Sequence, residues 1–486
     1  MPAGARAPRP RRRLLRYGLL LAGAGMLAAA ASLFYLQGQG IAPRTLAPYI
    51  EKRSSGHNAV ITGTGRWVGG TLLDLDRGER DGIAAALPRL GIGAQPGAVV
   101  ADGMAAARKP VASASEARSA LAGAMPGDVI VFQPGTYRID GELVATRPGA
   151  EGAPIVVRAE RPGTVTIEFD AVEGFKVLAP YWRFENLAIH GVCGRQEDCE
   201  HAFHVAGGAH HFAALNNTIL DFNAHFKING EGGRFPDAGR IEGNTLGNSA
   251  PRTTAAPVTP IDLVAANDWI VRRNLITDFI KTGGDQVSYG AFAKGAGART
   301  LFEQNVVLCE QRLRGLPGQR VGLSFGGGGT GKPYCRDRKC ITEQDQGTMR
   351  ANLVASCSDA GIYVNAAAGS RLVDNTVVDT AGVQVRFPES SAELDGNLVD
   401  GAVLSRNGAR LHLGDNLQTP LALLYLGYHP LRKLFIAPDS ADFSWREAPP
   451  LHTAAASSAD LCGATRARSR RYGAFDDFAA CLAPGR

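Results

Sequence analysis

The stretch FGGGGTGKPYC, from Phe325 to Cys335, contains the spacing G-x-x-x-x-G-K that holds the phosphates of a nucleotide in many enzymes. A phosphate loop continues with Ser or Thr and enters a helix, whereas Lys332 is followed by Pro333 and Tyr334. The sequence therefore argues against nucleotide binding. The glycines instead predict a loop whose backbone closely approaches a neighbouring segment or a ligand.

A second set of residues with chemical potential is acidic. Glu343 and Asp345 lie in TEQDQG, Asp359 lies in CSDAG, and Asp285 precedes them. If these carboxylates converge, one could protonate a leaving oxygen while another activates water, as in a glycoside hydrolase. Because Asp is also common in turns for backbone reasons, ordinary turn residues are the alternative.

Six of the ten histidines fall between His190 and His225. The order C-x₅-C-x-H-x₂-H, from Cys193 to His204, superficially resembles a zinc site. In an oxidising compartment the two cysteines would instead pair with each other. A sugar-binding surface that includes His204 and His211, and ordinary packed histidines, are the other interpretations.

The chain has eight cysteines, none of them before Cys193. An even number of cysteines in an exported protein predicts disulfides. The local spacings favour three pairs: Cys193 with Cys199, Cys335 with Cys340, and Cys462 with Cys481.

These residues lie within a repeat in which a short lead-in is followed by Asn and then by two or three mostly aliphatic or β-branched residues. The repeat recurs nine times, at Asn186, Asn217, Asn244, Asn274, Asn305, Asn352, Asn375, Asn397 and Asn416. Steps of about 20 to 30 residues between strand-like triplets predict a β-solenoid. We expect each Asn to occupy a left-handed corner, where its side chain bonds the same corner of the next coil.

The step from Asn305 to Asn352 is longer and contains an insertion. Cys309 and Cys357 follow these two asparagines at nearly equal distances. Adjacent coils lie about 4.8 Å apart, which is within disulfide reach, so we predict a bond between Cys309 and Cys357. The Gly-rich stretch then forms an excursion closed by Cys335 and Cys340, at the edge of a ligand-binding groove.

The solenoid is expected to begin with a cap. SASE, from Ser113 to Glu116, is a capping box that opens a short Ala-rich helix, and GDVIVFQPGTYRI follows with the first strands. Such a helix covers the open end of the stack. We therefore expect an all-β solenoid over residues 111–418, an uninterpreted segment over 37–110, and a C-terminal segment over 419–486 that packs on the solenoid.

The segments at 113–137 and 153–169 resemble the opening of right-handed parallel β-helix proteins of the pectate-lyase superfamily. The resemblance is strongest to the polysaccharide lyase family that contains chondroitinase B and alginate lyases. The ending DLCGATRARSRRYGAFDDF, residues 460–478, is also similar to tails of such proteins. The resemblance implies a right-handed parallel β-helix and an activity on polysaccharides.

The resemblance also implies a mechanism in which Ca²⁺ neutralises a uronate carboxylate, a Lys removes the proton at C5, and an Arg assists. Lys294 lies in the matching region for the base. The family's Arg belongs to an L-T-L-R-H-G run, but this chain has VGLSFGG there, with Arg320 as a nearby substitute. The acidic metal ligands are not reproduced, which leaves Asp285 as the candidate for Ca²⁺. A solvated surface lysine is the alternative role for Lys294.

The first 16 residues carry six arginines, which account for the whole net charge of +6. No basic stripe remains for nucleic-acid binding. The next twenty residues, 17–36, carry no charge and are long enough to span a bilayer. We expect an inner-membrane anchor with the solenoid in the periplasm, or export after cleavage of a signal peptide near Ala29 to Ala31.

The sequence thus favours an exported β-helix that cleaves a uronic-acid-containing polysaccharide by β-elimination. A non-catalytic carbohydrate-binding or envelope scaffold protein is the first alternative, and a paired-carboxylate hydrolase is the second. The expected substrate-binding residues are His204, His211, Tyr289, Gly327 and Gly328.

Overall fold

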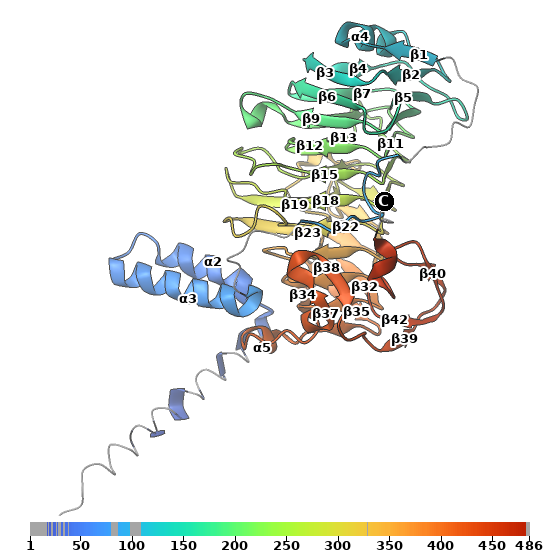
Figure 1. Cartoon of the computed structure of the whole chain (residues 1–486). Helices are drawn as coiled ribbons and strands as arrows, with labels where there is room; N and C mark the ends of the chain where they lie inside the picture. Colours follow the sequence, from blue (N-terminus) through green and yellow to red (C-terminus); the bar gives the residue numbers. More distant parts are fainter. Residues whose placement is uncertain are drawn as a thin grey trace, which may run out of the picture. The chain divides into compact units, whose positions relative to one another are not determined.

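The computed structural model describes residues 38–78, 86–97, 108–327 and 329–482, together with single positions between residues 17 and 36. The chain divides into two compact units, residues 1–76 with 420–428 and residues 77–419 with 429–486. In the second unit, short parallel strands stack in sequence order, starting from helix α4 (Ala114–Ala122) (Figure 1). This unit is the expected right-handed parallel β-helix.

Three long parallel sheets form the walls of the β-helix in the described part of the chain. The first sheet has 12 strands: β1 (Arg108–Val111), β2 (Val129–Phe132), β5 (Ile155–Ala159), β8 (Trp182–Glu185), β11 (Ala213–Leu215), β14 (Arg240–Glu242), β17 (Ile270–Arg272), β21 (Leu301–Glu303), β25 (Thr348–Arg350), β29 (Ser370–Val373), β32 (Ser391–Asp395) and β35 (Arg410–Leu413). The second sheet has 10 strands: β4 (Leu143–Ala145), β7 (Glu173–Val177), β10 (His201–Ala206), β13 (Ala224–Asn229), β16 (Ile261–Val264), β19 (Val287–Lys294), β23 (Gln319–Phe325), β27 (Ile362–Asn365), β31 (Gly382–Arg386) and β34 (Ala402–Arg406).

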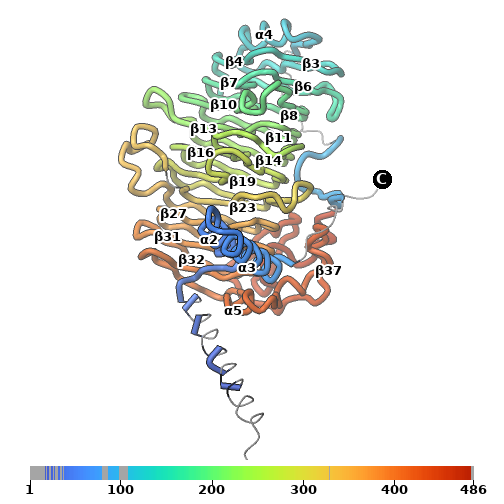
Figure 2. The backbone as a smooth tube through the Cα atoms, turned by 90° about the vertical axis from the view of Figure 1, so that its left-hand side faces the viewer, coloured from blue at the N-terminus to red at the C-terminus, as the bar shows by residue number. Residues whose placement is uncertain are grey.

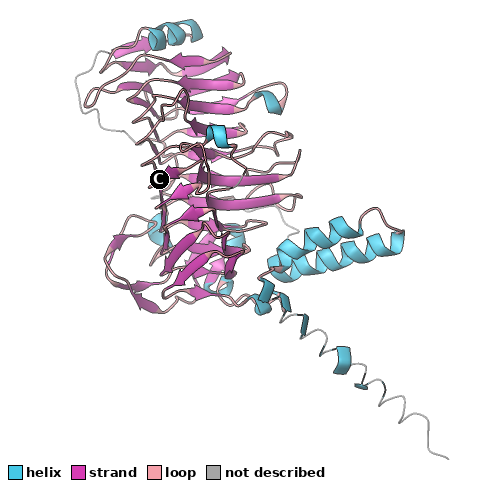
Figure 3. Cartoon of the chain, turned by 180° about the vertical axis from the view of Figure 1, so that it is seen from behind, coloured by secondary structure: helices cyan, strands magenta, loops and turns pink. Residues whose placement is uncertain are grey.

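The third sheet has 11 strands among the same described residues: β3 (Gly135–Asp140), β6 (Val165–Asp170), β9 (Ala188–Gly191), β12 (Thr218–Leu220), β15 (Thr245–Gly247), β18 (Leu275–Thr277), β22 (Val306–Leu308), β26 (Leu353–Ala355), β30 (Thr376–Val378), β33 (Leu398–Val399) and β36 (Leu417–Gln418). A small fourth sheet contains β20 (Gly297–Ala298), β24 (Gln344–Asp345) and β28 (Ala367–Ala368). Figure 2 shows the coils of the chain one above another, and Figure 3 shows how little helix this unit contains.

The interior of the β-helix is apolar because strand residues alternate between the two faces of each sheet. Phe175, Phe203 and Phe226 are in register on adjacent strands, and their rings stack with centroids 5.1 and 5.2 Å apart. Helix α4 covers the first coil with Ala117 and Leu121, which are both fully buried. The Ser113 hydroxyl accepts from the Glu116 amide at 3.2 Å, so the predicted capping box is confirmed.

The asparagines form a buried ladder along one corner of the coils. From Asn244 onward, the Oδ1 of each ladder Asn accepts from the backbone and side-chain amides of the ladder residue one coil earlier, and Asn217 Oδ1 accepts from the Leu187 amide. Asn305, for example, accepts from the N and Nδ2 of Asn274 at 3.1 and 3.0 Å. The same pattern connects Asn217, Asn244, Asn274, Asn305, Asn352, Asn375, Asn397 and Asn416. The predicted contact from coil to coil is confirmed.

Two details of the ladder differ from the prediction. Asn186 is in register with Asn216, one position before the ladder, so it is not a member. The left-handed residue is also not the ladder Asn but the residue before it, as at Arg273 and Gln304, with φ of 56° and 55°. The positive φ turns the chain at the corner, which leaves the Asn side chain free to point along the stack.

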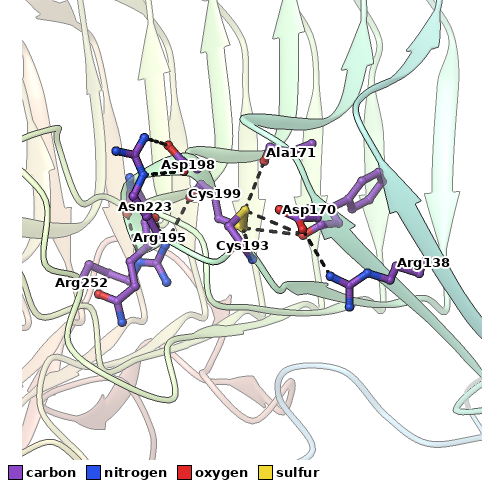
Figure 4. The surroundings of a disulfide bond; sticks show 11 residues. Arg138, Asp170, Ala171, Cys193, Arg195, Asp198, Cys199, Asn223 and Arg252 are labelled. Carbon is purple, nitrogen blue, oxygen red and sulfur yellow. Dashed lines mark hydrogen bonds and ion pairs between the residues drawn. A yellow bond between two sulfur atoms is a disulfide. The ribbon is translucent and has the colours of Figure 1, made fainter.

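All four predicted disulfides are present. Cys309 and Cys357 join adjacent coils with their Cα atoms 4.9 Å apart, Cys335 and Cys340 close the Gly-rich excursion, and Cys462 pairs with Cys481. Cys193 pairs with Cys199 across a short 3-10 helix, Gln196–Asp198 (Figure 4). Four disulfides are typical of a protein that folds in the periplasm or outside the cell.

The loop closed by Cys193 and Cys199 is also held by charged side chains. Arg195 makes two hydrogen bonds of 2.9 Å to Asp198, and Arg252 donates to Asn223 at 3.0 Å (Figure 4). Arg252 also donates to the backbone oxygen of Gln196. These bonds fix the chain immediately before strand β10.

The last part of the second unit forms an additional apolar layer on the third sheet. Phe435, Phe443, Phe475 and Phe478 cluster with outward residues of the third sheet, including Leu353. Three antiparallel pairs lie in this part: β37 (Phe435–Ala437) with β38 (Asp442–Trp445), β39 (Leu451–Thr453) with β42 (Ser469–Arg471), and β40 (Ser458–Ala459) with β41 (Thr465–Arg466).

The first unit contains helices α2 (Pro43–Ser54), α3 (Ala59–Arg77) and α5 (Leu421–Leu424). A buried ion pair of 2.6 Å joins Arg44 to Asp76. Within the described residues, no helix is long and apolar enough to span a membrane. Nine of the twenty residues of the expected anchor, 17–36, lie outside the described residues, so the anchor stays a prediction.

Candidate functional site

A single row of side chains crosses the outer face of the second sheet. Its members are in register on successive strands, and their sequence neighbours, such as Phe203 and Val205, point into the core. We call these residues the outer row: Lys176, His204, Lys227, Asp262, Phe292, Ser324, Tyr363 and Gln384.

The first half of the outer row is polar and charged. Lys227 Nζ lies 2.7 Å from an oxygen of Asp262. His204 Nδ1 lies 2.8 Å from Glu173 Oε1, and this hydrogen bond is the main reason that the pKa of Glu173 falls to about 2. Burial lowers the pKa of the neighbouring His201 to about 4, so this imidazole is neutral at physiological pH.

Lys294 lies at the end of β19, beside the middle of the outer row. Its ammonium lies 4.3 Å from the centre of the Phe292 ring, and its side chain is half-buried. Burial lowers the pKa of Lys294; the charge of Lys227 acts in the same direction, and Asp262 and Glu343 oppose it. A lysine in such surroundings loses its proton more readily, which is what a general base requires.

The described residues of the Gly-rich excursion, 326–327 and 329–343, contact this part of the sheet. Arg336 makes two bonds to Asp237, of 2.7 and 2.8 Å, and its guanidinium lies 4.3 Å from the Phe235 ring centre. The Arg336 amide also donates to the Gly295 oxygen at 2.9 Å. Phe292 is buried in a small cluster with Val264 and Ala265, against which Phe235 and Tyr289 pack, and the buried Ser324 hydroxyl donates to the Gly326 oxygen.

Glu343 joins this excursion to the end of strand β19. Its Oε2 accepts from the Gly295 amide at 3.1 Å and from the Thr330 hydroxyl at 3.0 Å, and the residue is 4% exposed. Asp345 lies in β24 of the fourth sheet, and Asp359 Oδ1 accepts from the Ala360 amide at 2.8 Å. The three acids lie on separate elements, and a shared site for them stays a prediction.

Arg320 is buried and bonded within its own loop, so its contacts do not support the predicted catalytic role. The side chain is 1% exposed, and its Nε donates to Glu310 at 2.8 Å. The remaining guanidinium nitrogens donate to the backbone oxygens of Leu316 and Pro317. A guanidinium that is fully engaged in the folding of its own loop cannot assist at a substrate.

The residues present do not fit the implied calcium site. Asp285 is 67% exposed and pairs with Lys281 at 2.7 Å. Calcium takes about six to eight oxygen ligands. In the described part of the chain, the only group of three His, Cys, Asp or Glu side chains close enough to share a metal ion is Glu173 with His201 and His204, which does not include Asp285.

The other predicted ligand-binding residues are divided between separate places. Tyr289 lies on β19, where its ring makes an edge contact of 5.4 Å with Phe292, and burial raises its pKa. Gly327 lies against the Lys294 side chain, whereas Gly328 is outside the described residues. His211 lies at a corner, stacked on Tyr181 and away from His204. Lys294, Tyr289 and Gly327 therefore lie together, and His204 lies further along the outer row.

Gly326 begins the excursion, and its backbone requires glycine. A Cβ at Gly326 would lie 1.7 Å from the Asn365 oxygen, and φ is 69°. Gly329 has a similar φ of 77° but open space around it. We therefore expect Gly326→Ala to lower the free energy of unfolding by about 2 kcal/mol more than Gly329→Ala, measured by chemical denaturation. Equal losses would show that the contact with Asn365 is unimportant.

Glu173, Lys227, Asp262 and Phe292 are not among the residues predicted from the sequence. A usable signal existed for three of them, because Lys227, Asp262 and Phe292 lie on strands between the Asn corners, whereas Glu173 precedes the first corner. Aligning the coils on the asparagines would have placed these strands side by side. It would not have shown which strand residues face outward, since the lengths of the connecting turns differ.

Comparison with known proteins gives a partial family match. Residues 111–226 match the family model described as Chondroitinase B. No curated protein matches the chain by sequence. Among solved structures, the chain is similar to pectate lyase Pel9A, with 14% identity and a TM-score of 0.48, covering 77% of this chain and 98% of that chain.

Two alginate lyases are also similar at low identity. The alginate lyase from Paenibacillus sp. str. FPU-7 is 16% identical, with a TM-score of 0.32, covering 64% of this chain and 99% of that one. The PL6 family alginate lyase AlyGC is 12% identical, with a TM-score of 0.35, covering 76% of this chain and 56% of that one. The predicted resemblance to the chondroitinase B family is confirmed over residues 111–226 by the family model.

Proposed function

We propose that this protein binds a uronic-acid-containing polysaccharide along the outer row and cleaves it by β-elimination, with Lys294 as the base. The observation that carries the proposal is the half-buried Lys294, whose pKa burial lowers, beside Asp262 and Lys227. The Chondroitinase B match over residues 111–226 supports a polysaccharide as the substrate. The cations Lys176 and Lys227 suit a chain of carboxylates.

In this reaction the neutral amine of Lys294 takes the proton from C5 of a uronate. The electrons of the C5–H bond form a double bond between C4 and C5, and the bond from C4 to the glycosidic oxygen breaks. The leaving oxygen then takes up a proton. Cations beside the sugar stabilise the charge that develops on the carboxylate. We assign this role to Lys227, which is the register partner of Asp262 in the outer row.

The test is incubation of the full chain with a panel of uronate polysaccharides. Elimination creates an unsaturated sugar that absorbs ultraviolet light, whereas hydrolysis creates a reducing end without that absorbance. We expect absorbance to grow with time on at least one substrate. New reducing ends without absorbance would instead indicate a hydrolase, and would contradict the proposal.

The pH dependence of cleavage should follow the protonation of Lys294. Because its pKa is below the ordinary value of 10.5, we expect the rate to rise with pH and to level off below that value. Asp262→Asn removes a charge that raises the pKa of Lys294, so the midpoint of the profile should move to lower pH. Rates measured across the alkaline range check this, and a midpoint that moves upward contradicts it.

A second candidate function is binding without cleavage. The observation that favours it is the position that corresponds to the family's Arg: Ser324 is fully buried, and its hydroxyl donates to the Gly326 oxygen at 2.7 Å. The guanidinium groups of Arg320 and Arg336 are paired with Glu310 and Asp237. Retained polysaccharide binding without any product would establish this scaffold role.

The disulfides support action outside the cytoplasm. We further propose that the uncharged residues 17–36 anchor the chain in the inner membrane and that the β-helix lies in the periplasm.

A further inference from the structure

We propose that Glu173, His201 and His204 bind a divalent transition-metal ion, with Zn²⁺ as the ion that the donor set fits best. The three side chains come from β7 and β10, at the polar end of the outer row. Their ligand atoms all lie within 4.8 Å of one another. This site is separate from Lys294 and does not depend on the proposed cleavage reaction.

The strand register brings these residues together. His201 is the partner of Glu173 on the adjacent parallel strands, and His204 lies three residues further along β10. The rings of His201 and His204 have centroids 5.5 Å apart. Ligand atoms around one zinc ion lie about 3 to 4 Å apart, since each bond is about 2.0 to 2.2 Å long. Small rotations of the side chains therefore suffice to close the site.

The hydrogen bonds of His204 indicate a shared cation. Asn229 donates its Nδ2 to the Gly230 oxygen at 3.2 Å, so its Oδ1 faces His204 Nε2 at 2.8 Å. That nitrogen must then carry hydrogen, which leaves a lone pair on Nδ1 in the neutral ring. Nδ1 nevertheless lies 2.8 Å from Glu173 Oε1, which is also an acceptor. Two acceptors approach this closely only around a proton or a metal ion.

The remaining contacts resemble the surroundings of a bound metal. Asn229 orients His204 through the nitrogen that does not face Glu173, as outer partners of metal-bound histidines commonly do. Lys176 Nζ contacts Glu173 Oε2 at 3.2 Å, which leaves Oε1 for the ion. His201 Nδ1 is buried without a hydrogen-bond partner among the described residues.

The site is open to ions from solution and has a defined chemical preference. The side chains of His204 and Glu173 are 17% and 19% exposed. Two imidazoles and one carboxylate suit zinc and its neighbours, whereas calcium prefers oxygen ligands alone. The cysteines of the C-x₅-C-x-H-x₂-H spacing cannot contribute, because Cys193 and Cys199 are bonded to each other.

The test uses Co²⁺ as a coloured probe and Zn²⁺ as its competitor, added to the full chain after chelation and dialysis. We expect one Co²⁺ per chain with the visible absorbance of a nitrogen- and oxygen-bound ion, displaced by Zn²⁺. His204→Gln and Glu173→Gln should each weaken binding by roughly 100-fold or more.

The matched control is His211→Gln. His210 and His211 form a second pair of histidines, with their Nδ1 atoms 2.8 Å apart on the exposed surface. Binding that survives in His204→Gln and is lost in His211→Gln would overturn the proposal, as would the absence of stoichiometric binding in the unaltered protein.

A measurement on the unaltered chain keeps the proposal testable if a variant fails to fold. Zn²⁺ should protect His201 and His204 from an acylating reagent, as mapped by peptide mass spectrometry, while the exposed His412 continues to react. Equal modification of His204 with and without Zn²⁺ would contradict the assigned ligands.

Discussion

Lys294→Met is expected to lower the rate of polysaccharide cleavage by about 10²- to 10⁴-fold, the usual contribution of a general base. Methionine keeps an apolar chain against Phe292 and Gly327 but cannot accept a proton. The measurement is the initial rate of ultraviolet absorbance with the substrate that the unaltered protein cleaves fastest.

The matched control for this substitution is Lys332→Met. Lys332 belongs to the same excursion but is exposed, so its loss should leave the rate within about twofold. Thermal unfolding of both variants separates catalysis from folding. If Lys294→Met kept the full rate, Lys294 would not be the base, and the reaction would need another proton acceptor.

Asn305→Ala is expected to produce the largest loss of stability, about 3 to 5 kcal/mol in the free energy of unfolding. Asn305 is fully buried. Its Oδ1 accepts two bonds from Asn274, and its Nδ2 donates to Asn352 Oδ1 and to the Val271 oxygen. Alanine leaves the Asn274 amide buried without a partner, which costs about 1 to 3 kcal/mol for each unsatisfied group. The midpoint of urea denaturation measures the change.

The control lies at the end of the same ladder. Asn416 also accepts two bonds, from Asn397, but it is only half-buried, so water can replace it. Asn416→Ala should therefore cost about 1 kcal/mol. A similar loss of unfolding free energy in both variants would mean that burial does not determine how much a ladder Asn stabilises the fold.

Much of the fold could be predicted because its signals are local or periodic. Ser113 and Glu116 define a helix start within four residues, and Cys309 and Cys357 occupy nearly equal positions on consecutive coils. The Asn corners recur because each corner meets the same backbone geometry one coil later. Such regularities are visible in one dimension, since a solenoid stacks equivalent residues directly on one another.

The candidate site was predicted less well, because it depends on segments that leave the repeat. Arg320 is placed next to the expected position of an arginine, but its loop folds so that Glu310 takes its guanidinium. Glu343 is bonded to Gly295 and Thr330 by the folding of the excursion. Gly295 and Thr330 are both more than ten residues from Glu343 in the sequence. A long loop also lacks a periodic pattern that would indicate its path.

The sequence by itself determined the stacking of coils, the cap, the disulfide pairs and the position of Lys294 near the matching region of the family. Only the tertiary structure decided which charged groups share the outer face, that Arg336 reaches Asp237 across the sheet, and that Glu173 meets His201 and His204. The physical reason is that strand register and loop path bring together residues tens of positions apart, and the free energy of each contact depends on burial and partners that a linear pattern does not contain.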